Sequence, residues 1–167
     1  MLIALLLATL VFVPMLFEWW LSRRNERALR AQGAVEPPGD VYTLMQVAYP
    51  ACFVAILVEC VQRDPLRDPL VAAGFTIFVG AKVLKYWAIS TLGVRWTFRV
   101  LVPPQSVIAA GGPYRLVRHP NYVAVMGELV GAALLGHAIV AGPLAVAVFG
   151  LLIGMRIRIE ERALGLR

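Results

Sequence analysis

Two polar clusters interrupt an otherwise apolar chain, and their residue types could together hold a charged nucleoside. The first runs from Gly111 to Tyr122 and contains the strings Gly-Gly-Pro-Tyr-Arg and Arg-His-Pro-Asn-Tyr. The second runs from Arg156 to Arg162 and contains two adjacent glutamates. Tyrosine offers flat apolar surface with a polar tip, arginine and histidine can hold an anionic group, and glutamates accept hydrogen bonds or lie near a cation. These groups suit a zwitterionic nucleoside that carries a sulfonium.

The same clusters have a simpler interpretation, which the residue types alone leave open. Basic residues beside an apolar helix bind lipid headgroups, and an acidic pair can stabilise a helix end without any ligand. The Gly-Gly-Pro turn beside Arg-His-Pro is not a general motif with a known mechanism. Both clusters fall on the same face of the membrane, so we expect them to converge on one pocket.

The composition predicts a membrane protein that folds as one domain over residues 1–167. The chain is 60% hydrophobic and 16% charged, with a mean hydropathy of +0.75, whereas a soluble domain is about half apolar and about a quarter charged. The apolar residues form blocks of roughly the 20 residues that cross a bilayer. These blocks are 2–21, 42–61, 70–91, 122–136 and 141–157. We expect an all-α polytopic bundle of about five transmembrane helices, with the short fourth block and the fifth forming a hairpin.

The distribution of charge predicts the orientation and excludes nucleic acid as a partner. Arginines gather after the first and third blocks and at the C-terminus, whereas the other side carries only Arg63 and Arg67, each near an aspartate. The positive-inside rule therefore places the N-terminus outside and the C-terminus in the cytoplasm. We expect the membrane to be a bacterial inner membrane. The net charge of +6 lies at the ends of apolar blocks, which favours anionic lipid over nucleic acid. Cys52 and Cys60 have no metal-binding spacing, so no metal is expected.

Charged and small residues inside the apolar blocks give further expectations. Glu128 with Lys82 and Lys85 could form a structural ion pair or contribute to a pocket, while Glu18 is expected at the membrane interface. Trp96 is either an interfacial anchor or a pocket residue. The glycine pairs at 127 and 131 and at 150 and 154 predict close packing of the last two helices against their neighbours.

The motifs resemble a known family of membrane enzymes. The string Gly-Pro-Tyr-Arg-x-x-Arg-His-Pro-x-Tyr at 112–122, followed by Arg-x-Glu-Glu-x-x-Leu at 158–164, is similar to the isoprenylcysteine carboxyl methyltransferase family. That family, with the related phospholipid methyltransferases, consists of integral membrane enzymes that use S-adenosylmethionine. The resemblance is specific over residues 92–164, which we expect to be the cofactor-binding and catalytic region. The family often has glycine where this chain has Ala124, which leaves the cofactor assignment in place.

The resemblance also implies roles for individual residues. Arg118, which would orient the acceptor oxygen, and Glu160 are the candidate catalytic residues. Arg158, Trp96 and Glu128 are candidates for further pocket positions. The residues implied to bind S-adenosylmethionine are Gly112, Tyr114, His119, Pro120, Tyr122 and Glu161.

The acceptor of the methyl group is the least defined part of this functional interpretation. The strings Arg-Asn-Glu at 24–26, Gly-Ala-x-Glu at 33–36 and Tyr-x-x-Met at 42–45 resemble a bacterial subgroup associated with O-methylation of long-chain alkylpyrones. This favours an oxygen of a lipophilic acceptor, either an alkylpyrone or alkylresorcinol hydroxyl or a prenylcysteine carboxylate. The alternatives are N-methylation of a phospholipid amine, or a non-enzymatic membrane scaffold or lipid-binding protein. The oligomeric state is not predicted.

Overall fold

The fold of the described residues consists of five helices and two short 3-10 turns. It is seen in a computed structural model that describes residues 1–63, 69–104 and 111–163. Arg67 and Leu164 therefore lie outside the described residues. The helices are α1 (Leu2–Ala31), α2 (Tyr42–Arg63), α3 (Leu70–Leu92), α4 (Pro120–Leu135) and α5 (Ala141–Ala163), and the turns are η2 (Gly93–Arg95) and η3 (Gly112–Arg115).

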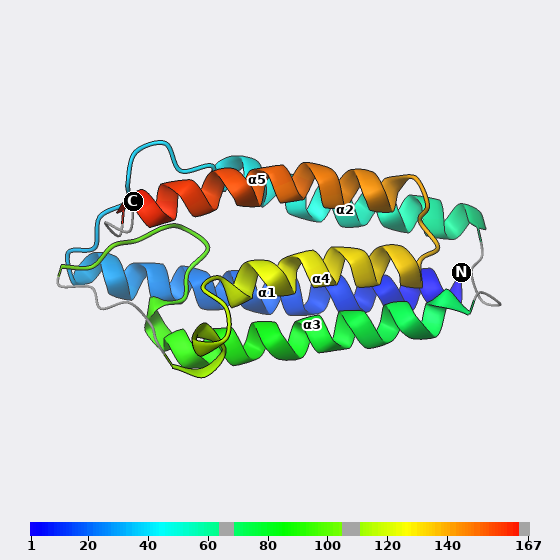
Figure 1. Ribbon diagram of the computed structural model, residues 1–167, viewed down its shortest axis with the longest axis horizontal. Helices are drawn as coiled ribbons and strands as arrows, with labels where there is room; N and C mark the ends of the chain where they lie inside the picture. The colour runs from blue at the N-terminus through cyan, green and yellow to red at the C-terminus, as the bar shows by residue number, and fades with distance from the viewer. Residues whose placement is uncertain (64–68, 105–110, 164–167) are drawn as a thin grey trace.

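The five helices lie side by side along the long axis of the molecule, with the two chain termini at opposite ends (Figure 1). α4 packs most extensively on α3, while α5 packs on both α2 and α4. Within the described ranges, four helices are long and apolar enough to cross a membrane, and α4 is a shorter apolar helix. The prediction of an all-helical polytopic membrane bundle is confirmed, including the short fourth helix and its hairpin with the fifth.

The first helix is longer than the apolar block that predicts it. α1 continues past the arginines to Ala31, because one face of this extension is covered by other parts of the chain. Ser22, Asn25 and Leu29 are buried there. The extension therefore supports the connection after α3, which forms much of the candidate site.

Small residues set the spacing of α3 and α4, as the sequence predicts for one of the two glycine pairs. A Cβ atom on Gly131 would lie 2.6 Å from the backbone nitrogen of Phe78, and a Cβ on Gly127 would lie 2.9 Å from the Cβ of Ala81. The second pair, Gly150 and Gly154, does not bring two helix backbones this close. A Cβ on Gly150 would lie 3.5 Å from Met126 Cε, in ordinary contact, and a Cβ on Gly154 would have no described atom within 4 Å. α5 does pack against α2 and α4 as predicted, but not through close backbone approach at this pair.

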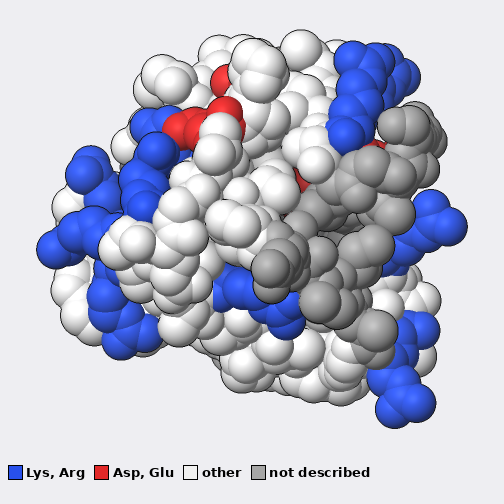
Figure 2. Space-filling model, turned by 90° about the vertical axis from the view of Figure 1, so that its left-hand side faces the viewer, with Lys and Arg blue, Asp and Glu red and all other residues white. Residues whose placement is uncertain are grey.

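One end of the bundle is rich in basic side chains. Figure 2 looks onto the end where α1, α3 and α5 finish, and Lys and Arg side chains surround that face while acidic ones are sparse. We call this the basic end. The segments 32–41, 93–104 and 111–119 lie here, and an isolated antiparallel bridge joins Val35 to Val102. Both polar clusters of the sequence are therefore at the same end of the molecule.

Candidate functional site

The two polar clusters of the sequence meet at the basic end of α4 and α5. His119 is the N-cap of α4, and Pro120 occupies the first helical position, where its missing N–H has no cost. The imidazole Nε2 of His119 lies 3.5 Å from Glu161 Oε1, and its Nδ1 lies 3.9 Å from Glu160 Oε2. Its ring stacks on Tyr122 with a centroid distance of 5.5 Å. The expected convergence of the Arg-His-Pro string and the paired glutamates is thus present.

A chain of hydrogen bonds connects the buried interior to a partly exposed carboxylate. The Tyr122 hydroxyl donates to Glu160 Oε2 at 2.7 Å and accepts from Arg156 Nε at 3.0 Å. Arg156 is only 5% exposed, whereas the side chain of Glu160 is 30% exposed. Tyr122 therefore links a buried guanidinium to a carboxylate that water can reach.

Tyr114 and Gly112 lie on η3 beside this cluster. Burial, followed by the negative charge of Glu160, raises the pKa of the Tyr114 phenol well above its usual value, so the phenol stays protonated. Gly112 has a φ of 53°, which glycine adopts without strain. A Cβ at this position would also meet Thr91 Oγ1 and would lie 3.2 Å from Trp87 Nε1. Only glycine lets η3 pack so closely on the end of α3.

The guanidinium of Arg156 is held by three separate parts of the chain. Its Nη1 donates to Asp40 Oδ1 at 2.8 Å, its Nη2 donates to the carbonyl oxygen of Phe98, and its Nε donates to Tyr122. Asp40 also accepts from the backbone N–H groups of Tyr42 and Val100. These contacts occupy three of the five N–H donors of the guanidinium and pair its charge with a carboxylate, as burial requires.

The segment 96–102 crosses the basic end, and we call it the strap. Asn25 on α1 donates to the carbonyl oxygen of Trp96 at 2.8 Å, and the backbone N–H of Phe98 donates to the Ser22 hydroxyl at 2.8 Å. Arg99 Nη1 donates to Glu36 at 2.6 Å. Burial opposes ionisation of Glu36, but hydrogen bonds from Arg99 and Arg30 outweigh it and lower the pKa of this carboxyl. The strap is therefore fixed both to α1 and to the segment before α2.

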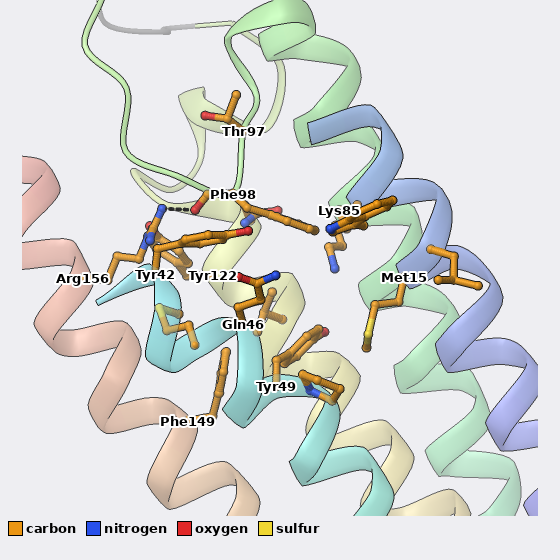
Figure 3. A pocket seen from close by; sticks show the side chains of 16 residues that line it. Met15, Tyr42, Gln46, Tyr49, Lys85, Thr97, Phe98, Tyr122, Phe149 and Arg156 are labelled. Carbon is orange, nitrogen blue, oxygen red and sulfur yellow. Dashed lines mark hydrogen bonds between the residues drawn. The ribbon is translucent and has the colours of Figure 1, made fainter. Parts of the chain in front are cut away.

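A cavity of about 370 Å³ lies beneath the strap, between α1, α2, α4 and α5 (Figure 3). Most of its wall is apolar, and polar groups enter it from Arg156, Tyr122 and Lys85. Leu16 and Trp19 of α1 are 67% and 42% exposed, so the cavity reaches the lipid-facing surface beside α1. The lining residues are Met15, Leu16, Trp19, Tyr42, Met45, Gln46, Tyr49, Pro50, Lys85, Thr97, Phe98, Asn121, Tyr122, Val125, Phe149 and Arg156.

A closed ring of four charges lies within the bundle next to this cavity. Lys85 Nζ lies 2.6 Å from Glu18 Oε2 and 3.1 Å from Glu128 Oε1. Lys82 Nζ lies 3.0 Å from Glu18 Oε1 and 2.9 Å from Glu128 Oε2. The Tyr49 hydroxyl donates to Glu128 at 2.7 Å, so the ring connects α1, α2, α3 and α4. Glu18 was expected at the membrane interface but is 1% exposed, because its carboxylate is held between the two lysines.

The remaining predicted residues lie outside the cluster. Arg118 and Arg158 are exposed and make no ion pair within the described part of the chain. Trp96 is 2% exposed and does not line the cavity itself. Its ring packs edge-on against Phe98 at 5.2 Å, and its Nε1 lies 3.4 Å from Asn121 Oδ1. Trp96 therefore supports two lining residues.

Arg156 is the functional candidate that the sequence reasoning missed. The sequence places Arg156 at the start of the second polar cluster but indicates no specific role for it. A signal was present, because Arg156 lies one turn after the buried Leu152 and Ile153 and one turn before Glu160, on the same helix face. Asp40 gave no comparable signal, since its contact with Arg156 joins residues that are far apart in the sequence.

Comparison with known proteins gives matches over most of the chain. A model of the isoprenylcysteine carboxyl methyltransferase family matches residues 72–165. The uncharacterized protein YpbQ of Bacillus subtilis is 28% identical over 159 residues, which cover 95% of each chain. An uncharacterized protein of Haemophilus influenzae is 28% identical over 145 residues, 86% of this chain and 84% of that protein. No solved structure matches the chain.

Proposed function

The chain belongs to the isoprenylcysteine carboxyl methyltransferase family of membrane methyltransferases, and we propose that it transfers a methyl group from S-adenosylmethionine to an oxygen of a lipophilic acceptor. The observation that carries this proposal is the Arg156–Tyr122–Glu160 chain, which joins the apolar cavity to a carboxylate at the basic end. This series of hydrogen bonds can position an acceptor oxygen and remove its proton. The positive-inside rule assigns the basic end to the cytoplasm, where the cofactor is available.

The residues at the basic end fit S-adenosylmethionine by their chemistry. Glu160 and Glu161 can accept from amino and hydroxyl groups and complement a cation. Tyr114 and the stacked pair His119 and Tyr122 offer flat surfaces to a nucleoside. We assign Arg118, exposed on the loop before α4, to the anionic carboxylate of the cofactor rather than to the acceptor.

The cavity fits the lipophilic part of an acceptor. Its lining is mostly apolar, and its opening beside Leu16 and Trp19 faces lipid. An amphiphile can therefore enter sideways from the bilayer between α1 and α2, with its polar head at Arg156 and its chain still in contact with lipid. We propose Arg156 as the group that orients the acceptor oxygen, because it lies in the cavity wall and Arg118 does not.

When bound, S-adenosylmethionine supplies the methyl group from its sulfonium sulfur, and the demethylated cofactor leaves as a neutral thioether. The protein's own task is to hold the acceptor oxygen and move its proton. A phenol or enol hydroxyl can donate to the Tyr122 oxygen, which still has a lone pair free. As the acceptor proton moves to Tyr122, the Tyr122 proton moves to Glu160 Oε2, and Glu160 releases it to water. A carboxylate acceptor is already ionised, so positioning by Arg156 is sufficient.

The long-chain alkylpyrone or alkylresorcinol is our preferred acceptor class, because its acidic hydroxyl uses the complete proton path. A prenylcysteine carboxylate would use Arg156 but not Glu160. A phospholipid amine fits less well, since the cation Arg156 lies at the polar end of the cavity and repels an ammonium.

The proposal is tested with purified protein in detergent, methyl-labelled S-adenosylmethionine and a long-chain alkylresorcinol. We expect labelled methyl ether as the product, identified by mass. The Tyr122→Phe variant removes the bridging hydroxyl, so kcat should fall about 100-fold, which is the lower end of the range for proton-transfer catalysis. Calorimetry with S-adenosylmethionine should show that this variant still binds the cofactor.

Two results would contradict the proposal. Absence of cofactor binding to the native protein would favour the scaffold or lipid-binding alternative. Label found on a phospholipid amine, with none on the phenol, would favour N-methylation.

A further inference from the structure

The cavity wall contains an ammonium group that the proposed methyl transfer does not use. Lys85 lines the cavity together with Gln46 and Tyr49 (Figure 3), and it is 2% exposed. It lies seven residues before the end of α3 at Leu92, which is about 10 Å along a helix. Lys85 also pairs with Glu128, which lies six residues beyond Tyr122 on α4, about 9 Å along a helix. Lys85 is therefore deeper in the bundle than the Tyr122 end of the same cavity.

The charge of Lys85 is balanced by its neighbours. The ring contains two ammonium groups and two carboxylates, and each lysine lies within 3.1 Å of both glutamates. The net charge of the ring is therefore zero. The ring therefore does not attract a free anion into the cavity, and any ligand contact with Lys85 is a hydrogen bond rather than the neutralisation of a charge.

Lys85 still has a donor to offer. An ammonium group carries three N–H bonds, and the two carboxylate contacts account for two of them. For the third, the described residues provide only the π face of Tyr49, at 5.4 Å from the ring centroid. Lys82 also contacts the carboxylates of Glu18 and Glu128, but it does not line the cavity. The two lysines thus differ in access to a ligand.

The neighbouring part of α2 also has polar capacity. Gln46 carries a side-chain amide, and Pro50 has no N–H to donate to the Gln46 carbonyl one turn earlier. Both residues line the cavity. The wall of this mostly apolar cavity therefore contains hydrogen-bonding groups that lipid tails cannot satisfy.

We propose that Lys85 determines acceptor specificity by donating its third N–H to a second, neutral oxygen of the acceptor. This inference rests on the proposed function, and it narrows the acceptor to single-chain amphiphiles with two oxygen groups in the polar part. A volume of 370 Å³ holds about a dozen groups of water size, each of about 30 Å³. That is room for a substituted ring and the start of its chain. A site built to donate to an oxygen rejects the analogue that lacks it.

The test compares two probes with the same saturated chain, an alkylresorcinol with two hydroxyl groups and an alkylphenol with one. Binding to the full-length protein is measured by calorimetry in detergent without cofactor, and methyl transfer is measured separately. We expect the native protein to bind the resorcinol about tenfold more tightly than the phenol. The Lys85→Met/Glu18→Gln variant, which keeps the ring neutral, should bind both probes equally.

A matched variant separates this role from the structural role of the ring. Lys82→Met/Glu18→Gln removes the same number of charges but leaves Lys85 in the wall, so the tenfold preference should persist. Lys85→Met/Glu128→Gln is a second neutral variant if the first does not fold. Tyr49 keeps a partner in it, because the glutamine amide oxygen can accept its hydroxyl.

The outcomes are distinct for the two proposals. Equal binding of both probes by the native protein overturns the role of Lys85, as does a preference that survives its removal or disappears in the Lys82 control. A Lys85-dependent preference without methyl transfer supports the binding role and contradicts the proposed reaction instead.

Discussion

At the residue scale, the buried guanidinium of Arg156 is the most demanding feature of the site. A charge removed from water is expensive unless it is paired and hydrogen-bonded, and Arg156 meets this requirement through Asp40, Tyr122 and the Phe98 carbonyl. Asp40 and Phe98 come from connections and not from helices. The same contacts that offset the cost of burial therefore fix the strap over the cavity.

The two candidate arginines can be distinguished by kinetics. Arg156→Lys keeps the charge but loses the planar fork of donors, so we expect kcat/KM for the acceptor to fall at least tenfold while the KM for S-adenosylmethionine is unchanged. Arg118→Ala should raise the KM for S-adenosylmethionine several-fold and leave the acceptor KM unaltered. Steady-state kinetics with each substrate varied in turn measures both. A loss of turnover in Arg118→Ala with normal cofactor binding would return the orienting role to Arg118.

At the scale of elements, the close contact of α3 and α4 positions both the charge ring and the start of α4. Gly131 and Gly74 face each other across this contact, and a Cβ on Gly131 would lie 2.9 Å from the Gly74 carbonyl oxygen. Lys82 and Lys85 reach Glu128 only because the helix axes are so near. Lipid does not drive helices together by the hydrophobic effect, so such backbone contact and the polar ring hold the pair.

The importance of this contact can be measured with a matched pair of substitutions. Gly131→Ala places a methyl group against the backbone of α3 and should lower the free energy of unfolding by about 1–3 kcal/mol. Gly154→Ala meets nothing within 4 Å in the described structure, so it should be neutral or slightly stabilising. Thermal unfolding in detergent compares the two. Equal effects would show that α3 can move away from α4 without cost.

At the scale of the whole molecule, the bundle separates two routes to one site. The cavity is open to lipid beside α1, whereas the cluster of His119, Glu160 and Glu161 lies at the basic end. The strap lies above the cavity, and its Phe98 forms part of the cavity wall. In the proposed reaction, the lipophilic acceptor and the water-soluble cofactor would thus approach from different sides, with the basic end facing the cytoplasm.

Thiol labelling of intact cells tests that orientation. Ile139→Cys, at the exposed turn between α4 and α5, should react with a membrane-impermeant reagent, and Gln32→Cys, at the end of α1, should react only after lysis. The native Cys52 and Cys60 are buried, so background labelling should be low. The opposite pattern would place the basic end outside and would remove access to cytoplasmic cofactor.

The sequence alone determined the features that depend on local composition. Block length and hydropathy predicted the helices, because backbone groups in lipid must be paired within each segment. The strings around His119 and Glu160 predicted which polar groups meet, since both lie at helix ends on the same side. The family resemblance then extended these residues to a methyl-transfer chemistry.

Only the tertiary structure decided which charged side chains are buried at and beside the cavity. Arg156, Asp40 and Glu18 lie in segments whose composition is equally typical of surface or interface positions, and their partners are far away in the sequence. Conversely, Arg118 belongs to the motif but is exposed. Burial of a charge depends on the partners that packing brings within about 3 Å, and sequence patterns do not contain that distance.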